Sequence, residues 1–217
     1  MSNLSLKPTH DGSFTIHNSE LNETYHSIHG ARQESEHVYI KNGLQLLDAE
    51  KLNILEVGVG TGLNLLLTMN YIKTNKSMKV KYTGLEPYPI EEKLLEEYIS
   101  TNSKTVKEKE TWIAAMYHPK TLSSSIFIEH LTDKVQNLEL VNQFDIIYFD
   151  AFAPTKQSEM WGVEVFENLY KMAKTGCLFT TYCAQGQFKR NLAKAGFRVE
   201  NVPGPPGKRE MTLGFKD

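Results

Sequence analysis

The chain has 217 residues, of which 40% are hydrophobic and 23% charged, and its formal net charge is −2. This length fits one domain, and the lack of a large positive charge argues against charge-driven, non-specific nucleic-acid binding, while a local basic patch is still allowed. The two cysteines, Cys177 and Cys183, lie on one strand-like segment and are predicted to be unbridged. Residues 1–7 contain no apolar signal segment and no run is long enough to span a membrane, so we expect a cytoplasmic protein with no membrane partner.

The first 50 residues predict an extension that packs on the main domain. Residues 8–30 are rich in polar and turn-forming side chains and contain short alternating pieces such as 13–16, which predict a small β-hairpin or an extended arm. A helix is predicted over Ala31–Asp48, where the apolar side chains form an imperfect face.

From residue 51 onward, strand-like runs alternate with helical patterns. Strands are predicted at 53–57, 80–86, 125–129, 144–150 and 177–183, and helices at 63–73, from about 90, at 162–173 and at 185–195. This alternation predicts a mostly parallel sheet with helices on both faces. The closing strands, 197–202 and 210–215, share one loop and predict an antiparallel edge hairpin. We therefore expect a single α/β domain over residues 1–217, with 1–50 as the extension and 51–217 as the core.

The segment 53–64 is the most informative ligand signal. A short apolar strand is followed by Gly58, Gly60 and Gly62, and then by a helical pattern. A backbone without side chains can turn tightly and lie against a ligand, and the helix N-terminus presents free N–H groups to it. Glu56 places a carboxylate before the first glycine, which suits a cationic ligand, and the glycine spacing differs from the dinucleotide fingerprint. The pattern favours S-adenosylmethionine; a tight turn without a ligand is the alternative.

Two further acids stand where predicted strands end. Glu86 could accept hydrogen bonds from the two hydroxyls of a ribose, although a charge in the first turn of a helix is the alternative. Asp150 ends a very apolar strand and therefore faces the same crevice as the glycine loop. An ionised Asp150 could orient an amine nucleophile and take its proton as a methyl group arrives; a turn or helix-capping role is the alternative. The neighbouring residues that suit a shaped substrate pocket are Phe152, Pro154 and Trp161.

Weaker signals come from the remaining polar residues. Asp133 follows the third predicted strand, where an acid could contact adenine, but a solvated loop charge explains it equally well. Lys208 and Arg209 could meet a phosphate or an RNA backbone, or could belong to an ordinary hairpin turn. The seven histidines show no metal-ligand spacing, so we expect no metal, and His26 and His29 are interpreted as surface residues.

Taken together, these motifs resemble the MnmC-like methyltransferases of bacterial tRNA wobble-uridine modification. The segments that carry the resemblance are 25–27, 30–31, 34–35, 56–64, 150–154, 160–161 and 208–211. The resemblance implies a Rossmann-like fold, S-adenosylmethionine as cofactor, and methyl transfer to the primary amine of 5-aminomethyl-2-thiouridine in tRNA. It places Asp150 beside the transferred methyl group and the amine, and Lys208 and Arg209 near the mouth where RNA arrives. The resemblance also implies that Glu86 holds the ribose and that the methionine end is lined by Glu34, Gly58 and Gly60. The predicted cofactor-binding residues are Glu34, Glu56, Gly58, Gly60, Gly62, Asn64, Glu86 and Asp133.

The resemblance also bears on partners and alternatives. In many bacteria this domain is fused to a flavin-dependent oxidase; no second glycine fingerprint is present here, so we expect a separate oxidase or another tRNA-modifying enzyme to supply the amine. The nearest alternative is a transferase of the same fold that methylates or aminopropylates a small-molecule amine. Aminopropyl transfer uses a decarboxylated donor, whereas a polar group such as Glu34 at the methionine end would serve an intact amino acid, so Glu34 argues against that reaction. A nicotinamide oxidoreductase is disfavoured by the loop spacing and Glu56, and a non-catalytic RNA-binding module by the net charge.

Overall fold

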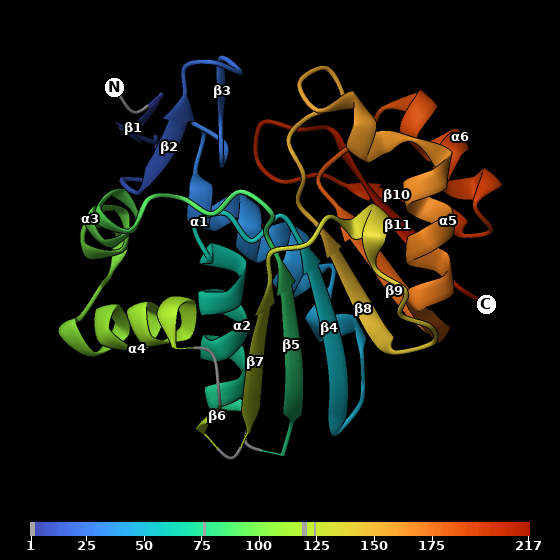
Figure 1. The fold of residues 1–217 in the computed structure, drawn as a ribbon, viewed down its shortest axis with the longest axis horizontal. Helices are drawn as coiled ribbons and strands as arrows, with labels where there is room; N and C mark the ends of the chain where they lie inside the picture. The colour runs from blue at the N-terminus through green and yellow to red at the C-terminus, as the bar shows by residue number, and fades with distance from the viewer. Residues whose placement is uncertain (1–2, 76, 119–120, 124) are drawn as a thin grey trace.

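The computed structural model describes residues 3–75, 77–118, 121–123 and 125–217. Its centre is an eight-stranded sheet with the strand order β10-β11-β9-β8-β4-β5-β7-β6 (Figure 1). The strands of this sheet are β4 (Lys51–Val57), β5 (Lys79–Leu85), β6 (Thr121–Ser123), β7 (Ile126–Leu131), β8 (Phe144–Phe149), β9 (Ala173–Thr181), β10 (Arg198–Pro203) and β11 (Glu210–Phe215).

Five neighbouring strands of this sheet run parallel, from β9 through β8, β4 and β5 to β7. β11 pairs antiparallel with β9, β10 pairs antiparallel with β11, and β6 pairs antiparallel with β7. The fold is therefore the predicted α/β, Rossmann-like arrangement with a C-terminal antiparallel hairpin. The α-helices are α1 (Ala31–Ser35), α2 (Leu63–Thr74), α3 (Glu92–Asn102), α4 (Val106–Tyr117), α5 (Val163–Met172) and α6 (Gly186–Lys194).

Helices cover both faces of the sheet because its strand side chains alternate between two apolar clusters (Figure 1). Ile54 and Tyr82 pack with α2, α3 and α4 on one face. Leu55 and Phe149 pack with α5 and α6 on the other. All four are essentially inaccessible to solvent, and burial of each such side chain contributes about 1.5–3 kcal/mol. By the same alternation, Glu56 points to the face of Ile54, below α2.

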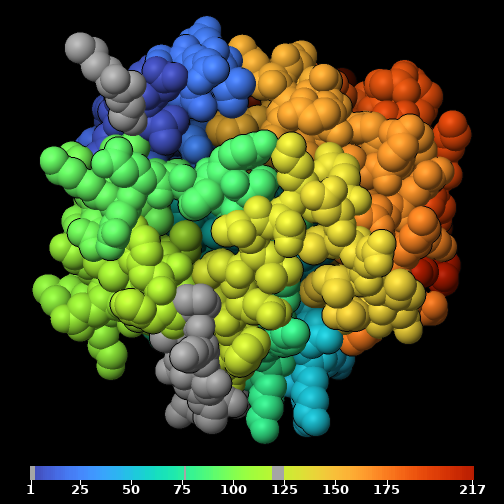
Figure 2. Space-filling model, in the orientation of Figure 1, coloured from blue at the N-terminus to red at the C-terminus, as the bar shows by residue number. Residues whose placement is uncertain are grey.

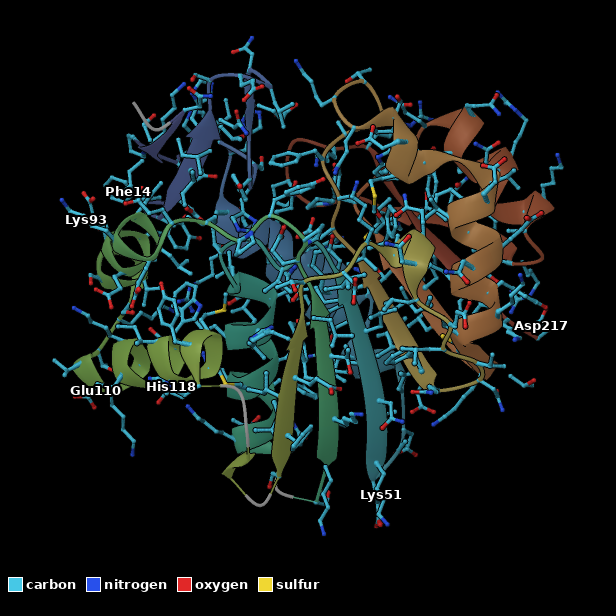
Figure 3. All side chains as sticks on the ribbon, viewed as in Figure 1. Phe14, Lys51, Lys93, Glu110, His118 and Asp217 are labelled. Carbon is cyan, nitrogen blue, oxygen red and sulfur yellow. The ribbon has the colours of Figure 1, made fainter. Side chains whose placement is uncertain are left out.

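The N-terminal region forms a small antiparallel sheet, which contains the predicted hairpin. It contains β1 (Leu4–Pro8), β2 (Phe14–Asn18) and β3 (Glu23–Thr24), so the extension starts earlier than the alternating pattern indicated. The backbone N–H of Phe14 donates to Oδ1 of Asn102 at 2.8 Å, which fastens this sheet to α3. Figure 3 shows Phe14 beside α3 and Lys51, the start of β4, at the far end of the molecule. The small sheet therefore lies over the end at which the parallel strands finish.

The predicted single helix over Ala31–Asp48 is wrong. The chain forms α1, then a π-helix over Glu36–Lys41 (η1), and then a 3₁₀ turn over Leu44–Leu46 (η2). The break falls at Gly43, where a Cβ would lie 2.3 Å from the carbonyl oxygen of Tyr39. The π-helix buries Val38, Tyr39 and Ile40 in succession.

Smaller shifts concern element boundaries. α5 ends at Met172, and β9 starts at Ala173, before the predicted strand. The acidic helical surface from about residue 90 is confirmed as α3 and α4, with the turn between them at 103–105. Thr105 caps α4, because its hydroxyl accepts a hydrogen bond from the backbone N–H of Glu108 at 3.1 Å. The remaining short 3₁₀ turns are Val135–Asn137 (η3) and Ser158–Trp161 (η4).

Candidate functional site

A cavity of about 1020 Å³ opens where β4, β5 and β8 end. Its wall combines the glycine loop after β4, the N-terminal arm, the segment that follows β8, and the loop between β10 and β11. In the space-filling view, the arm (blue) and the segment after β8 (gold to orange) border each other at the top of the molecule (Figure 2). Open α/β sheets bind ligands at this edge, and the volume suits a nucleoside-sized molecule.

Two of the three loop glycines line this cavity, and the third packs against α4. Gly58 has φ of 88°, and a Cβ there would lie 2.6 Å from the carbonyl oxygen of Asp150. Gly60 has φ of 49°, and its Cβ would lie 2.9 Å from the ring of Tyr25. Gly62, at φ of 72°, precedes α2 away from the cavity wall, and a Cβ there would lie 2.3 Å from the sulfur of Met116. The structure thus explains Gly62 by the packing of α4, not by ligand contact.

Glu86 lies in the cavity wall next to the glycine loop. The backbone N–H of Gly60 donates to its Oε2 at 2.9 Å, and the N–H of Tyr88 donates to its Oε1 at 3.1 Å. Burial raises the pKa of Glu86, and these two hydrogen bonds oppose the rise. Each oxygen keeps a second lone pair, so the side chain is fixed in place and can still accept from a ligand hydroxyl.

Asp150 forms one end of a buried hydrogen-bonded network. Nδ2 of Asn64 donates both to Oδ2 of Asp150 and to Oε1 of Glu56, each at 2.8 Å. The hydroxyl of Tyr82 donates to the other Glu56 oxygen at 2.5 Å. Burial raises the pKa of Asp150 to about 6, against the hydrogen bonds from Tyr39 and Asn64, which lower it. Asp150 faces the cavity, and this pKa leaves it largely ionised at neutral pH.

The same network corrects the predicted role of Glu56. Its side chain is fully buried beneath α2 and does not line the cavity. Burial raises the pKa of Glu56 to about 8, so the group is largely protonated at neutral pH. A neutral carboxyl out of reach of the cavity cannot serve as an anionic contact for a cationic ligand. Asn64, 1% exposed, is likewise behind the wall, and its amide holds Asp150.

Glu34 and Lys208 meet in the cavity wall from opposite ends of the chain. Nζ of Lys208 lies 2.7 Å from Oε2 of Glu34 and 4.2 Å from the centre of the Tyr182 ring. The hydroxyl of Tyr182 donates to the carbonyl oxygen of Ala151 at 2.8 Å, which holds the ring beside Asp150. Lys208 is therefore part of the cavity, whereas the side chain of Arg209 is 94% exposed and lies outside it.

Three other predicted residues do not reach the cavity wall. Asp133 is exposed on the loop after β7, and the residues after it, 134–136, line the cavity instead. Trp161 is 4% exposed, and its Nε1 donates to the carbonyl oxygen of Phe152 at 2.8 Å, so it supports the wall from behind. Pro154 does not line the cavity either. Phe152 does, and its ring packs edge-on against Tyr25 with centroids 5.0 Å apart.

The N-terminal arm contributes side chains that the sequence reasoning missed. Tyr25 covers the glycine loop, and burial raises its pKa to about 12. His26 was predicted to be a surface residue but is 8% exposed, and its Nε2 lies 2.8 Å from the hydroxyl of Thr61. Burial lowers the pKa of His26 to about 4, so the ring is neutral and structural. The only signal for this role was the place of residues 25–27 in the resemblance; His29 is exposed, as predicted.

Within the described ranges, no group of three or more His, Cys, Asp or Glu side chains is arranged to hold a metal ion. The two cysteines are free and buried. No helix in the part of the chain that the structure describes is both long and apolar enough to cross a membrane.

Comparison with known proteins identifies the family. The model of a family described as S-adenosyl-L-methionine-dependent methyltransferase matches residues 91–217, which is more than half of the chain. The chain belongs to this family. The methyltransferase therefore uses S-adenosyl-L-methionine as its cofactor, as the glycine loop predicted.

Curated relatives refine the assignment. The methyltransferase is 28% identical over 211 residues to the "tRNA 5-methylaminomethyl-2-thiouridine biosynthesis bifunctional protein MnmC" of Leptospira interrogans, covering 90% of this chain and 33% of that protein. It is 29% identical over 223 residues to the protein of the same name from Pseudoalteromonas atlantica, covering 91% and 31%. The methyltransferase is thus MnmC-like, and it spans about a third of the length of these relatives.

Solved structures agree on the fold. MnmC2 from Aquifex aeolicus superposes with a TM-score of 0.81 at 20% identity, covering all of this chain and 72% of that one. Spermidine synthase from Thermotoga maritima superposes with a TM-score of 0.60 at 16% identity, covering 98% and 68%. At these identities both comparisons establish the fold alone.

Proposed function

We propose that this methyltransferase transfers a methyl group from S-adenosyl-L-methionine to the primary amine of 5-aminomethyl-2-thiouridine in tRNA, giving 5-methylaminomethyl-2-thiouridine. The observation that carries the proposal is Asp150, a carboxylate in the wall of the cavity formed by Gly58, Gly60 and Glu86. The names of the curated relatives supply the substrate class. An acidic cavity also suits both cationic reactants, the sulfonium cofactor and an alkylammonium acceptor.

The cavity has the features that the cofactor needs. Gly58 and Gly60 line the cavity with backbone alone, and their positive φ angles of 88° and 49° suit glycine, so a ligand can lie directly against this loop. In this proposal Glu86 accepts hydrogen bonds from the ribose hydroxyls, and Glu34 receives the methionine end; both side chains line the cavity. The bound cofactor supplies an electrophilic methyl group on a sulfonium.

Asp150 supplies the acid–base chemistry in this proposal. An alkylamine is mostly protonated at neutral pH, and only its free base can attack a methyl group. Asp150 would hold the ammonium, accept its proton and orient the nitrogen lone pair toward the methyl group. The N–C bond forms as the S–C bond breaks, leaving S-adenosylhomocysteine, and most of the rate comes from alignment.

The rest of the wall fits a nucleoside acceptor. Phe152, Tyr25 and the exposed ring of Tyr88 present aromatic surface at the cavity, and stacking on aromatic rings is how proteins commonly hold unpaired bases. Lys208 lines the same cavity as Asp150, and we place the exposed Arg209 near the approach of the RNA. The amine itself must come from another activity, either an oxidase or a different tRNA-modifying enzyme.

The deciding experiment is nucleoside analysis of tRNA from cells that lack this protein, with and without the gene for the wild-type chain or Asp150→Asn. We expect the aminomethyl nucleoside to accumulate, the wild type to restore its methylated form, and Asp150→Asn to fail. An unchanged nucleoside profile would contradict the proposal. Methylation or aminopropylation of a small-molecule amine by the purified protein, with no transfer to undermethylated tRNA, would favour the alternative acceptor.

A further inference from the structure

We propose that Glu23, on the N-terminal arm, is a second carboxylate for the acceptor and binds the alkylammonium group of the RNA nucleoside opposite Asp150. Glu23 would thereby make the enzyme select an acceptor whose amine carries a positive charge. The inference rests on the proposed function, because it concerns the same amine in the same cavity. It assigns a substrate contact to an arm residue.

Glu23 lies on β3 with its side chain toward the cavity. It pairs with Asn18 of β2, and it lines the cavity wall. Successive side chains of a strand point to opposite sides, so Glu23 shares a side with Tyr25, whose backbone N–H continues the pairing with β2. The ring of Tyr25 lies against Gly60 and Phe152, both in the cavity wall. The arm therefore presents Glu23 and Tyr25 together to a bound acceptor.

Tyr182 relates the position of Glu23 to that of Asp150. The hydroxyl of Tyr182 donates to the carbonyl oxygen of Ala151 at 2.8 Å, directly after Asp150 in the chain. Burial raises the pKa of Tyr182, and the negative charges of Asp150, Glu34 and Glu23 raise it further. Glu23 on the arm and Asp150 at the sheet edge thus act on one hydroxyl group. An ammonium group placed beside Asp150 is attracted by Glu23 as well.

Glu23 has capacity to bind a cation. Two other glutamates of the wall already have partners: Glu34 is in an ion pair, and each carboxylate oxygen of Glu86 accepts from a backbone N–H. Glu23 accepts from the backbone N–H of Thr24, through Oε1 at 3.1 Å. Among the residues that the structure describes, no Lys, Arg or His forms an ion pair with Glu23. A half-buried carboxylate without a cation is suited to binding an ammonium group in the cavity.

The methyl transfer gives a second acceptor a defined use. An alkylammonium group has three N–H bonds. After one proton has passed to Asp150, two N–H bonds remain and the nitrogen lone pair must point at the methyl carbon. A single hydrogen-bond acceptor leaves the nitrogen free to turn about its C–N bond, whereas acceptors at both Asp150 and Glu23 fix its direction. Glu23 takes no proton in this scheme.

Two forms of one tRNA test the contact in a binding experiment on the full chain with S-adenosylhomocysteine present. The first is tRNA from cells that lack this protein, and the second is the same tRNA after acetylation of its primary amine, which removes the charge. We expect the wild type to bind the first form more tightly. For Glu23→Ala this preference should fall by about 10- to 100-fold, as for loss of one hydrogen bond to a charged group. Its affinity for S-adenosylhomocysteine should change by less than about twofold.

Two other variants control for structural effects. Glu20→Ala removes an exposed carboxylate from the same wall, next to β2, and should leave the preference unchanged. Glu23→Gln keeps the shape of the side chain and one acceptor oxygen. It should reduce the preference by about 3- to 10-fold, because a neutral partner bonds about half as strongly as a charged one. If Glu23→Ala fails to fold, Glu23→Gln carries the test.

The outcomes separate this inference from the proposed function. If the Glu23 variants keep the wild-type preference, or weaken both forms of tRNA equally, Glu23 does not bind the amine. In either case methyl transfer to tRNA can still stand. If the wild-type protein transfers no methyl group to the amine-bearing tRNA, the proposed function itself is wrong.

Discussion

Asn64→Leu tests whether the buried network sets the charge of Asp150. The substitution keeps the approximate volume of the side chain but removes the Nδ2 that donates to Asp150 and Glu56 at 2.8 Å. A hydrogen bond to a charged group contributes about 1.5–3 kcal/mol, and one pKa unit corresponds to about 1.4 kcal/mol. Because this bond favours the ionised form, its loss should raise the pKa of Asp150 from about 6 by about 1–2 units.

The pH dependence of kcat/KM for methylation of undermethylated tRNA would reveal this change. The acid limb should move from about pH 6 in the wild type to about pH 7–8 in Asn64→Leu. At pH 7 the ionised fraction of Asp150 would fall from about nine-tenths to between about a half and a tenth. The ¹³C shift of the Asp150 carboxyl, followed through a pH titration, gives the same pKa without an acceptor substrate.

Tyr82→Phe is the matched control, because Tyr82 bonds to Glu56 and not to Asp150. It should leave the acid limb in place, and thermal unfolding of both variants would show that they fold. An unchanged midpoint in a folded Asn64→Leu variant would refute the reasoning. A loss of S-adenosylhomocysteine affinity without any pH shift would instead support cofactor contact by Asn64, as the sequence predicts.

Three further predictions follow from the same site. Asp150→Asn should lower single-turnover methylation by about 10²–10⁴-fold while calorimetry still detects S-adenosylhomocysteine; a variant with normal turnover would exclude proton transfer by Asp150. Gly58→Ala places a Cβ 2.6 Å from a backbone oxygen and should abolish cofactor binding. Its control is Gly176→Ala, at φ of 83° with nothing within 4 Å, which should cost only backbone strain of about 1–2 kcal/mol. Equal effects of the two variants on cofactor binding would argue against a close-packed glycine loop. The raised pKa of Glu56 means that the folded protein holds a proton that the unfolded chain releases. The stability contributed by this group is therefore complete below pH 4.5 and is lost as pH rises through about 8. In urea unfolding at a series of pH values, Glu56→Gln should flatten this loss, and parallel plots of unfolding free energy against pH for the two proteins would contradict the prediction.

The order of the central strands and helices could be predicted because it rests on local patterns. Apolar runs such as 53–57 and 144–150 alternate with helical stretches, and that pattern depends only on neighbouring residues. The loop glycines and Asp150 could be predicted for the same reason, because they directly follow strands whose ends share one edge of the sheet. The broken helix after Ala31 could not, because the approach of Gly43 to the Tyr39 carbonyl oxygen is a feature of the folded backbone.

The roles of individual site residues needed the tertiary structure. Glu56 stands before the glycine loop in the sequence, but strand alternation together with Asn64 and Tyr82 turns it into a buried, largely neutral acid. Nothing in the sequence around His26 marks it as buried; its ring is held by a hydrogen bond with the hydroxyl of Thr61, which lies on another segment. By itself the sequence determined the α/β class, the cofactor loop and the carboxylate opposite it. Only the tertiary structure decided which acids carry charge and that Glu34 meets Lys208, because burial and ion pairing depend on residues that are distant in the chain and adjacent in the fold.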